Sequence, residues 1–130
     1  MNKLYSAVPD GYCGDEDNGQ TSAWYVFSAM GFYPVCPATD EYVIGSPLFK
    51  KITISLPGNK KLFIESFNNS SQNIYVQDLK WNGISTTKNF QRHSELLKGG
   101  KLQFSMGRSP NKKRGIESAD YPYSFSTENK

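Results

Sequence analysis

The sequence GYCGDEDNGQTSAWYVFSAMGFYP, residues 11–34, joins an acidic turn to an apolar segment that closes on a glycine and a proline. The Asn-Gly pair at 18–19 is a turn signal, so we expect the acidic residues on a loop that leads into a helix. Residues 23–30 carry no charge and are predicted to form that helix, with Thr21 or Ser22 as its N-cap. Loops that lead into helices often carry functional groups, which makes this stretch the first candidate for a site.

The predicted helix is short, and it is apolar on nearly every face. Gly31 supplies its stop and Pro34 follows. A helix of this kind requires protein around it, so we expect it to lie inside a larger body. Asp15 and Asp17 would then face the positive end of the helix dipole, which favours their ionised forms and suits a general base or a ligand of a hard cation. The residues alone equally allow a plain acidic turn that caps a core helix.

Beyond Thr39 the chain alternates between apolar and polar residues, as half-buried strands do. Two hairpins are predicted, because a Pro-Gly-Asn turn follows the first alternating run and an Asn-Gly turn follows the second. A Gly-Gly pair introduces the last run. The predicted strands are 52–56 and 62–67, 74–81 and 84–90, and 102–106. The fold class is therefore α+β and mostly β: one short apolar helix, then an antiparallel β-sheet or small β-sandwich.

Composition and pattern divide the chain into three regions. Residues 1–38 hold the acidic loop and the buried helix, residues 39–110 form the antiparallel β-rich region, and residues 111–130 make a basic tail that we expect to be loosely ordered. The 37% hydrophobic content is enough for one modest core. The segment 68–73, NNSSQN, is predicted to be a solvated loop, and its Asn69 formally matches a glycosylation acceptor.

Four stretches of the chain carry a family resemblance. They are GDEDNGQTSAWYVFSAMGFYPVCP at 14–37, EYVIGSPLF at 41–49, WNG at 81–83 and HSELLKGGKLQFSMG at 93–107. Together they resemble the C-terminal portion of glycoside hydrolase family 92, whose members are calcium-dependent, inverting exo-α-mannosidases, among them α-1,2-mannosidases. The resemblance covers most of the chain. Thr21 departs from it, since many relatives have Met there.

The resemblance implies a catalytic role for Asp15 and Asp17. In the family, the Asp-x-Asp pair is the general base that activates a water, and a separate carboxylic acid protonates the leaving oxygen at about 6.5–9.5 Å from the base. That acid is a glutamate upstream of the motif, in an architecture of an N-terminal β-sandwich and an (α/α)6 barrel several times longer than this chain. We therefore expect a C-terminal portion of an α-mannosidase that carries the base and is inactive by itself. The alternative is a non-catalytic β-sandwich module that binds carbohydrate or packs against another domain.

Calcium is the cofactor that the resemblance implies, and Asp17 is the candidate ligand. The ion takes about 6–8 oxygen ligands, so we expect weak binding by these residues alone. An EF-hand loop that begins at Asp15 is excluded, because Gly19 comes one position too early and Val26 stands where the bidentate glutamate belongs.

The same resemblance implies mannose-containing glycans and the remainder of a mannosidase chain as partners. The apolar helix adds a second copy of the chain as a candidate partner. A nucleic-acid partner is not favoured: the net charge of +3 is scattered, with one basic triplet at 112–114. No apolar run approaches the roughly 18 residues of a membrane span, and residues 1–9 lack the apolar centre of a signal peptide. The sequence assigns no compartment, although the family is commonly periplasmic or secreted in bacteria.

Cys13 and Cys36 allow one disulfide at most, and free buried thiols are the favoured state. His93 is the single histidine, and without a second one it is predicted to anchor a hairpin rather than bind a metal. A Cys13–His93 hydrolase is not favoured, because we expect the two residues in distant segments.

Overall fold

Two β-sheets and one main helix make up the part of the chain that the computed structural model describes, residues 4–14, 16 and 18–127. The predicted fold class, mostly β with a single N-terminal helix, is confirmed. The elements in chain order are α1 (Gln20–Met30), β1 (Phe32–Tyr33), β2 (Glu41–Ile44), β3 (Lys51–Leu56), β4 (Lys60–Phe67), β5 (Tyr75–Trp81), β6 (Ile84–Thr86), β7 (Phe90–Arg92), α2 (His93–Leu96), β8 (Gly100–Gly107) and the 3-10 turns η1 (Ser118–Asp120) and η2 (Phe125–Thr127).

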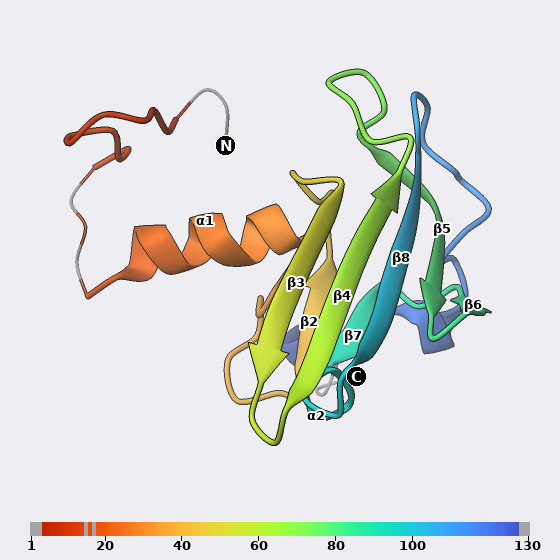
Figure 1. Cartoon of the computed structure of the whole chain (residues 1–130). Helices are drawn as coiled ribbons and strands as arrows, with labels where there is room; N and C mark the ends of the chain where they lie inside the picture. Colours follow the sequence, from red (N-terminus) through yellow and green to blue (C-terminus); the bar gives the residue numbers. More distant parts are fainter. Residues whose placement is uncertain (1–3, 15, 17, 128–130) are drawn as a thin grey trace.

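Helix α1 ends at Gly31, as the sequence predicts. Gly31 has a left-handed φ of 92°, and its N–H donates to carbonyls of the last turn. The C-terminal end of α1 meets the sheets and its N-terminal end points away from them (Figure 1). Ala29 is buried and Phe27 and Met30 pack on the core, while Val26, one turn before Met30, is 54% exposed. The described residues therefore cover the last turn of the helix more completely than the turn before it.

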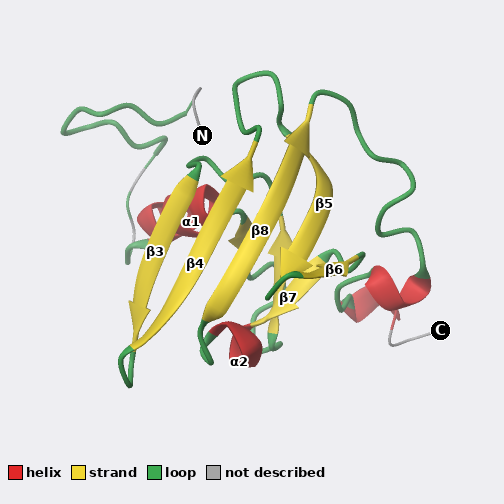
Figure 2. Ribbon diagram, turned by 45° about the vertical axis from the view of Figure 1, so that its right-hand side comes forward, coloured by secondary structure: helices red, strands yellow, loops and turns green. Residues whose placement is uncertain are grey.

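The five-stranded sheet contains both predicted hairpins, and its strand order is β3-β4-β8-β5-β6 (Figure 2). β3 and β4 pair antiparallel around the turn at 57–59, and β5 and β6 pair antiparallel around Asn82 and Gly83. Both residues of the second turn have positive φ, 49° and 85°, as an Asn-Gly hairpin turn requires. Strand β8 lies between the two hairpins, so no strand of one hairpin pairs with a strand of the other.

The pairing of β4 with β8 is parallel, with Ile64 opposite Leu102, whereas every other pairing in this sheet is antiparallel. The alternation of residues 102–106 predicts a strand, but it carries no information on the direction of its neighbours. The sheet is therefore mixed where the sequence indicated antiparallel pairs.

A second sheet has the order β1-β2-β7 and packs behind the first (Figure 2). The predicted strand 84–90 is wrong in its second half: β6 stops at Thr86, and Phe90 lies in β7, opposite Val43 of the other sheet. The reason is visible at Asn89. Its backbone carbonyl accepts from the N–H of Ile44 at 2.9 Å, and its N–H donates to the backbone carbonyl of Asp120 at 2.8 Å. The chain has therefore left the first sheet before Asn89.

The core lies between the two sheets. Leu79, Leu102 and Phe104 are completely buried on the inner face of the five-stranded sheet, and Phe32 from β1 and Leu96 from α2 close over them. These side chains come from the alternate positions of each strand, so the period-2 pattern of the sequence specifies the inner face. The arrangement is that of a small β-sandwich.

The segment after Pro110 differs from the loose order expected of residues 111–130. The Arg114 guanidinium donates to Asn89 Oδ1 at 2.9 Å and to the Lys88 carbonyl at 2.6 Å. The buried carboxylate of Asp120 accepts from the Thr87 hydroxyl at 2.6 Å. Burial lowers the pKa of Arg114. These bonds tie residues 111–121 to the β6–β7 connection.

No helix in residues 4–14, 16 and 18–127 has both the length and the apolar character to cross a membrane.

Candidate functional site

The acidic loop lies at the N-terminal end of α1, where the sequence predicts it. The candidate general base, Asp15 and Asp17, lies outside the described residues. The same is true of the candidate calcium ligand, which is Asp17. Glu16 between them is described, and its carboxylate accepts from the N–H of Ser22 at 3.1 and 3.4 Å. Glu16 is thus fastened to the first turn of the helix.

The N-cap differs from the prediction of Thr21 or Ser22. Gly19 occupies that position with a φ of 75°, and it has no side chain to cap with. Glu16 performs the task from outside the helix, because its carboxylate reaches the third N–H of α1 and complements the positive end of the dipole. The Asn-Gly turn signal was sufficient to predict the bend but not the residue that caps it.

The Thr21 hydroxyl is buried without a hydrogen-bond partner among the described residues. A buried polar group without a partner costs about 1–3 kcal/mol. The first turn of α1 therefore holds one buried donor that the described residues leave unpaired.

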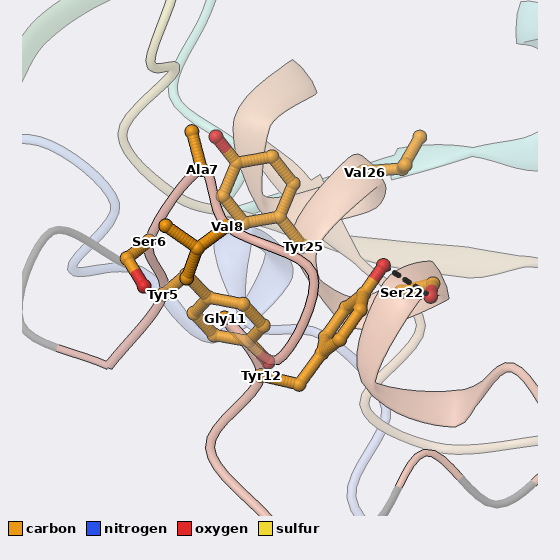
Figure 3. Close-up of a pocket in the computed structure, with 9 residues that line it drawn as sticks. All are labelled: Tyr5, Ser6, Ala7, Val8, Gly11, Tyr12, Ser22, Tyr25 and Val26. Atoms are coloured by element: carbon orange, nitrogen blue, oxygen red, sulfur yellow. Dashed lines mark hydrogen bonds between the residues drawn. The ribbon is translucent and has the colours of Figure 1, made fainter.

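An aromatic hollow of about 310 Å³ lies between residues 5–12 and the N-terminal half of α1 (Figure 3). Tyr5, Tyr12 and Tyr25 line it, and the Ser22 hydroxyl donates to the Tyr12 hydroxyl at 3.2 Å. Tyr5 stacks on Trp24 with ring centroids 5.6 Å apart and meets the edge of Tyr12 at 6.0 Å. These contacts hold residues 5–12 against the N-terminal half of α1.

Partial burial raises the pKa of Tyr5, and its neighbour Cys13 adds to the rise. Tyr5 therefore keeps its proton throughout the neutral range and acts as a donor: its hydroxyl reaches the Thr21 carbonyl at 3.4 Å. The sequence analysis missed this hollow. The available signal is the density of aromatic residues on either side of the acidic loop.

The two cysteines are free, and the expectation of buried thiols is wrong: Cys13 is exposed and Cys36 is half-buried. His93 opens α2 rather than lying in a strand, and its Nδ1 is 2.8 Å from the Tyr42 hydroxyl. No hydrogen bond joins Cys13 to His93 within the described ranges. The residues of a Cys–His hydrolase are thus not brought together.

Calcium does not fit the described residues by themselves. No group of three or more His, Cys, Asp or Glu side chains that could hold a metal occurs in residues 4–14, 16 and 18–127. Glu16 supplies the described carboxylate of the acidic loop, and this carboxylate already accepts a hydrogen bond from the Ser22 N–H at the N-terminus of α1. A calcium site here requires ligands beyond these residues.

Comparison with known proteins gives one consistent result. The family model "Glycosyl hydrolase family 92 catalytic domain" matches residues 1–108. A secreted glycosidase of Arthroderma benhamiae, named as uncharacterized, is 31% identical over 107 residues, which are 80% of this chain and 14% of that protein.

Two solved structures from Bacteroides thetaiotaomicron are similar in fold and sequence. A family GH92 inverting mannosidase has a TM-score of 0.88 and 54% identity over 96% of this chain, and a family GH92 alpha-mannosidase has a TM-score of 0.89 and 37% identity over 95%. The chain covers 17% of each of these proteins, so it spans about a sixth of their length.

Proposed function

Because the chain belongs to glycoside hydrolase family 92, we propose that it supplies the general-base loop of an inverting exo-α-mannosidase that acts on mannose-containing glycans. The observation that carries this proposal is the family match over residues 1–108, which includes the whole acidic loop and α1. The names of the two bacterial structures support it, since both are mannosidases and one is inverting.

In the proposed mechanism, Asp15 and Asp17 accept the proton of a water that attacks the anomeric carbon. A carboxylic acid from another part of the protein, about 6.5–9.5 Å from the base, protonates the leaving oxygen on the opposite face. The described residues contribute electrostatics and position. The N-terminal end of α1 favours ionised carboxylates, and the bonds from Ser22 to Glu16 fasten the loop that carries the base.

Calcium belongs to the proposal through family membership. Asp17 would supply one oxygen, and the other ligands would come from outside the described residues, since these hold no cluster of their own. The ion would engage hydroxyls of the sugar.

The first test replaces the base. In the longest natural form of the protein, the double variant D15N/D17N should lose about 10²–10⁴-fold in kcat on mannobiosides, because a general base contributes that much. Its thermal unfolding should match the wild type. The control is D10N, an exposed carboxylate in the same N-terminal region. Wild-type turnover by D15N/D17N would refute the assignment of the base.

The second test uses the 130-residue chain. It should hydrolyse α-1,2-, α-1,3- and α-1,6-mannobiose at no more than the uncatalysed rate, because a base without its acid lacks most of the transition-state complementarity. The longest natural form should prefer the α-1,2 linkage. Rapid turnover by the 130-residue chain would show that the acid lies within it.

A non-catalytic β-sandwich module is the second candidate, and one observation favours it. The buried core cluster and the side chains packed on it include no residue before Phe27, so the two sheets close their core without the acidic loop. In this case D15N/D17N would leave glycan binding intact and the longest natural form would show no mannosidase activity to lose.

A further inference from the structure

The outer face of the five-stranded sheet carries a second hollow, at the end where β3 begins and β4 stops. Its volume is about 460 Å³. It shares no lining residue with the aromatic hollow beside α1. The side chains that matter for its chemistry are Lys50, Lys51, Glu65, Phe67 and Asn68.

Phe67 gives the hollow an apolar surface. Its neighbours Ile64 and Ser66 on the same strand are buried, but Phe67 is 51% exposed at the strand end. Complete burial of a phenylalanine contributes about 1.5–3 kcal/mol, and the described part of the chain leaves about half of this ring in water. The ring is thus free to cover the apolar face of a ligand.

The wall of the hollow is fixed by hydrogen bonds. The Asn69 amide donates to the carbonyls of Pro47 at 2.9 Å and Leu48 at 3.3 Å, and the Asn73 amide donates to the Asn68 carbonyl at 2.8 Å. Asn68 itself turns the chain with a φ of 59°. Because the loop is held in place before any ligand arrives, binding here costs little ordering of the chain.

Hydrogen-bond donors and acceptors surround the Phe67 ring. Lys50 and Lys51 are exposed and offer N–H donors. Glu65 Oε2 accepts from Gln103 at 3.1 Å and lies 3.6 Å from the Lys101 ammonium, while its other oxygen takes no hydrogen bond within the described ranges. The exposed Asn68 amide can donate and accept. The hollow therefore combines one aromatic surface with donors and acceptors at its rim.

We propose that this hollow binds a pyranose unit of a glycan, with the C–H face of the sugar on Phe67 and its hydroxyls on Lys51, Glu65 and Asn68. A pyranose has one apolar face and a ring of hydroxyls that donate and accept, which matches this arrangement. A wholly apolar ligand finds a single apolar side chain here. The site goes beyond the proposed hydrolysis and does not depend on Asp15 or Asp17.

The test is affinity electrophoresis of the 130-residue chain in gels that contain soluble mannan, glucan, galactan or xylan. At least one polysaccharide should retard the wild type, and F67A should weaken that binding at least tenfold. The matched control is F49A, which removes a ring of the same 51% exposure that does not line the hollow. D15N/D17N should bind like the wild type, so failure of this proposal is distinguishable from failure of the mannosidase proposal.

Thermal unfolding of F67A and F49A would establish that both variants are folded. Absence of retardation by all four polysaccharides would overturn the proposal. Equal retardation of F67A and the wild type, or equal loss in F67A and F49A, would also overturn it, because binding would then not pass through this ring.

Discussion

Gly31 shows how one residue meets two requirements at once. Its φ of 92° lies in the left-handed region, and a Cβ placed on it would lie 3.0 Å from Pro47 Cβ and 3.1 Å from Phe104 Cζ. Pro47 and Phe104 are buried, so neither side chain has room to move. The sequence alone predicts the first requirement, as a helix stop, but not the second, which depends on a strand more than seventy positions away.

Gly83 allows these two requirements to be separated. Its φ is 85°, but nothing lies within 4 Å of a Cβ placed there. Alanine at either position costs about 1–2 kcal/mol for the left-handed backbone, and overpacking adds about 1–3 kcal/mol at Gly31 only. We therefore expect G31A to lower the unfolding free energy clearly more than G83A in urea titrations. Equal losses would mean that the core yields around the added methyl group.

At the scale of elements, Asp40 joins the start of β2 to α2. Its carboxylate accepts from the Ser94 N–H at 2.9 Å and from the Ser94 hydroxyl at 2.6 Å, and the N–H of His93 donates to its carbonyl at 3.0 Å. Helix α2 has four residues and no side-chain cap of its own, so this remote carboxylate satisfies its first turn. The hydrogen bonds from Ser94 hold the pKa of Asp40 below its usual value.

The lowered pKa predicts a pH dependence. A carboxylate whose pKa is depressed on folding contributes stability above its unfolded pKa of about 3.9, and this contribution is lost as the pH falls through the folded value. The difference in unfolding free energy between wild type and D40N should therefore be largest above about pH 4 and shrink below it.

S94A is the companion variant, since it keeps the charge of Asp40 but removes the hydroxyl donor. It should show a smaller change of the same sign. Urea titrations from pH 7 to pH 3 would measure all three proteins. A difference between wild type and D40N that stays constant over this range would contradict the role of the Asp40 charge.

At the scale of the whole molecule, the elements with local signals were predictable. Both hairpins and the end of α1 depend on turn residues that are adjacent in sequence. The sheet β1-β2-β7 has strands of two to four residues, too short for a periodic pattern, and the parallel direction of β8 is set by packing. The general-base assignment of Asp15 and Asp17 came from family resemblance and stays a prediction. The hollow at Phe67 is lined by residues 50–51 and 65–69, which lie apart in the sequence, so no local pattern predicts it.

One apolar surface of the molecule leads us to propose self-association. Val8 and Val26 line the same hollow beside α1, and each is more than half exposed. The 130-residue chain should therefore form concentration-dependent dimers in sedimentation velocity, and V26E should weaken them. I84E is the matched control, because Ile84 is 74% exposed in β6. A monomer at every concentration would contradict this proposal.

The position of β8 bears on how the protein is made. Synthesis proceeds at about 5–20 residues per second, so the hairpins β3–β4 and β5–β6 leave the ribosome before β8. Until β8 inserts between them, the edges of β4 and β5 that will pair with it are unpaired. The nascent chain is most exposed to edge-to-edge aggregation during this interval. Synonymous codons that slow translation between residues 87 and 107 should lengthen it, and we expect them to lower the yield of folded protein in cells.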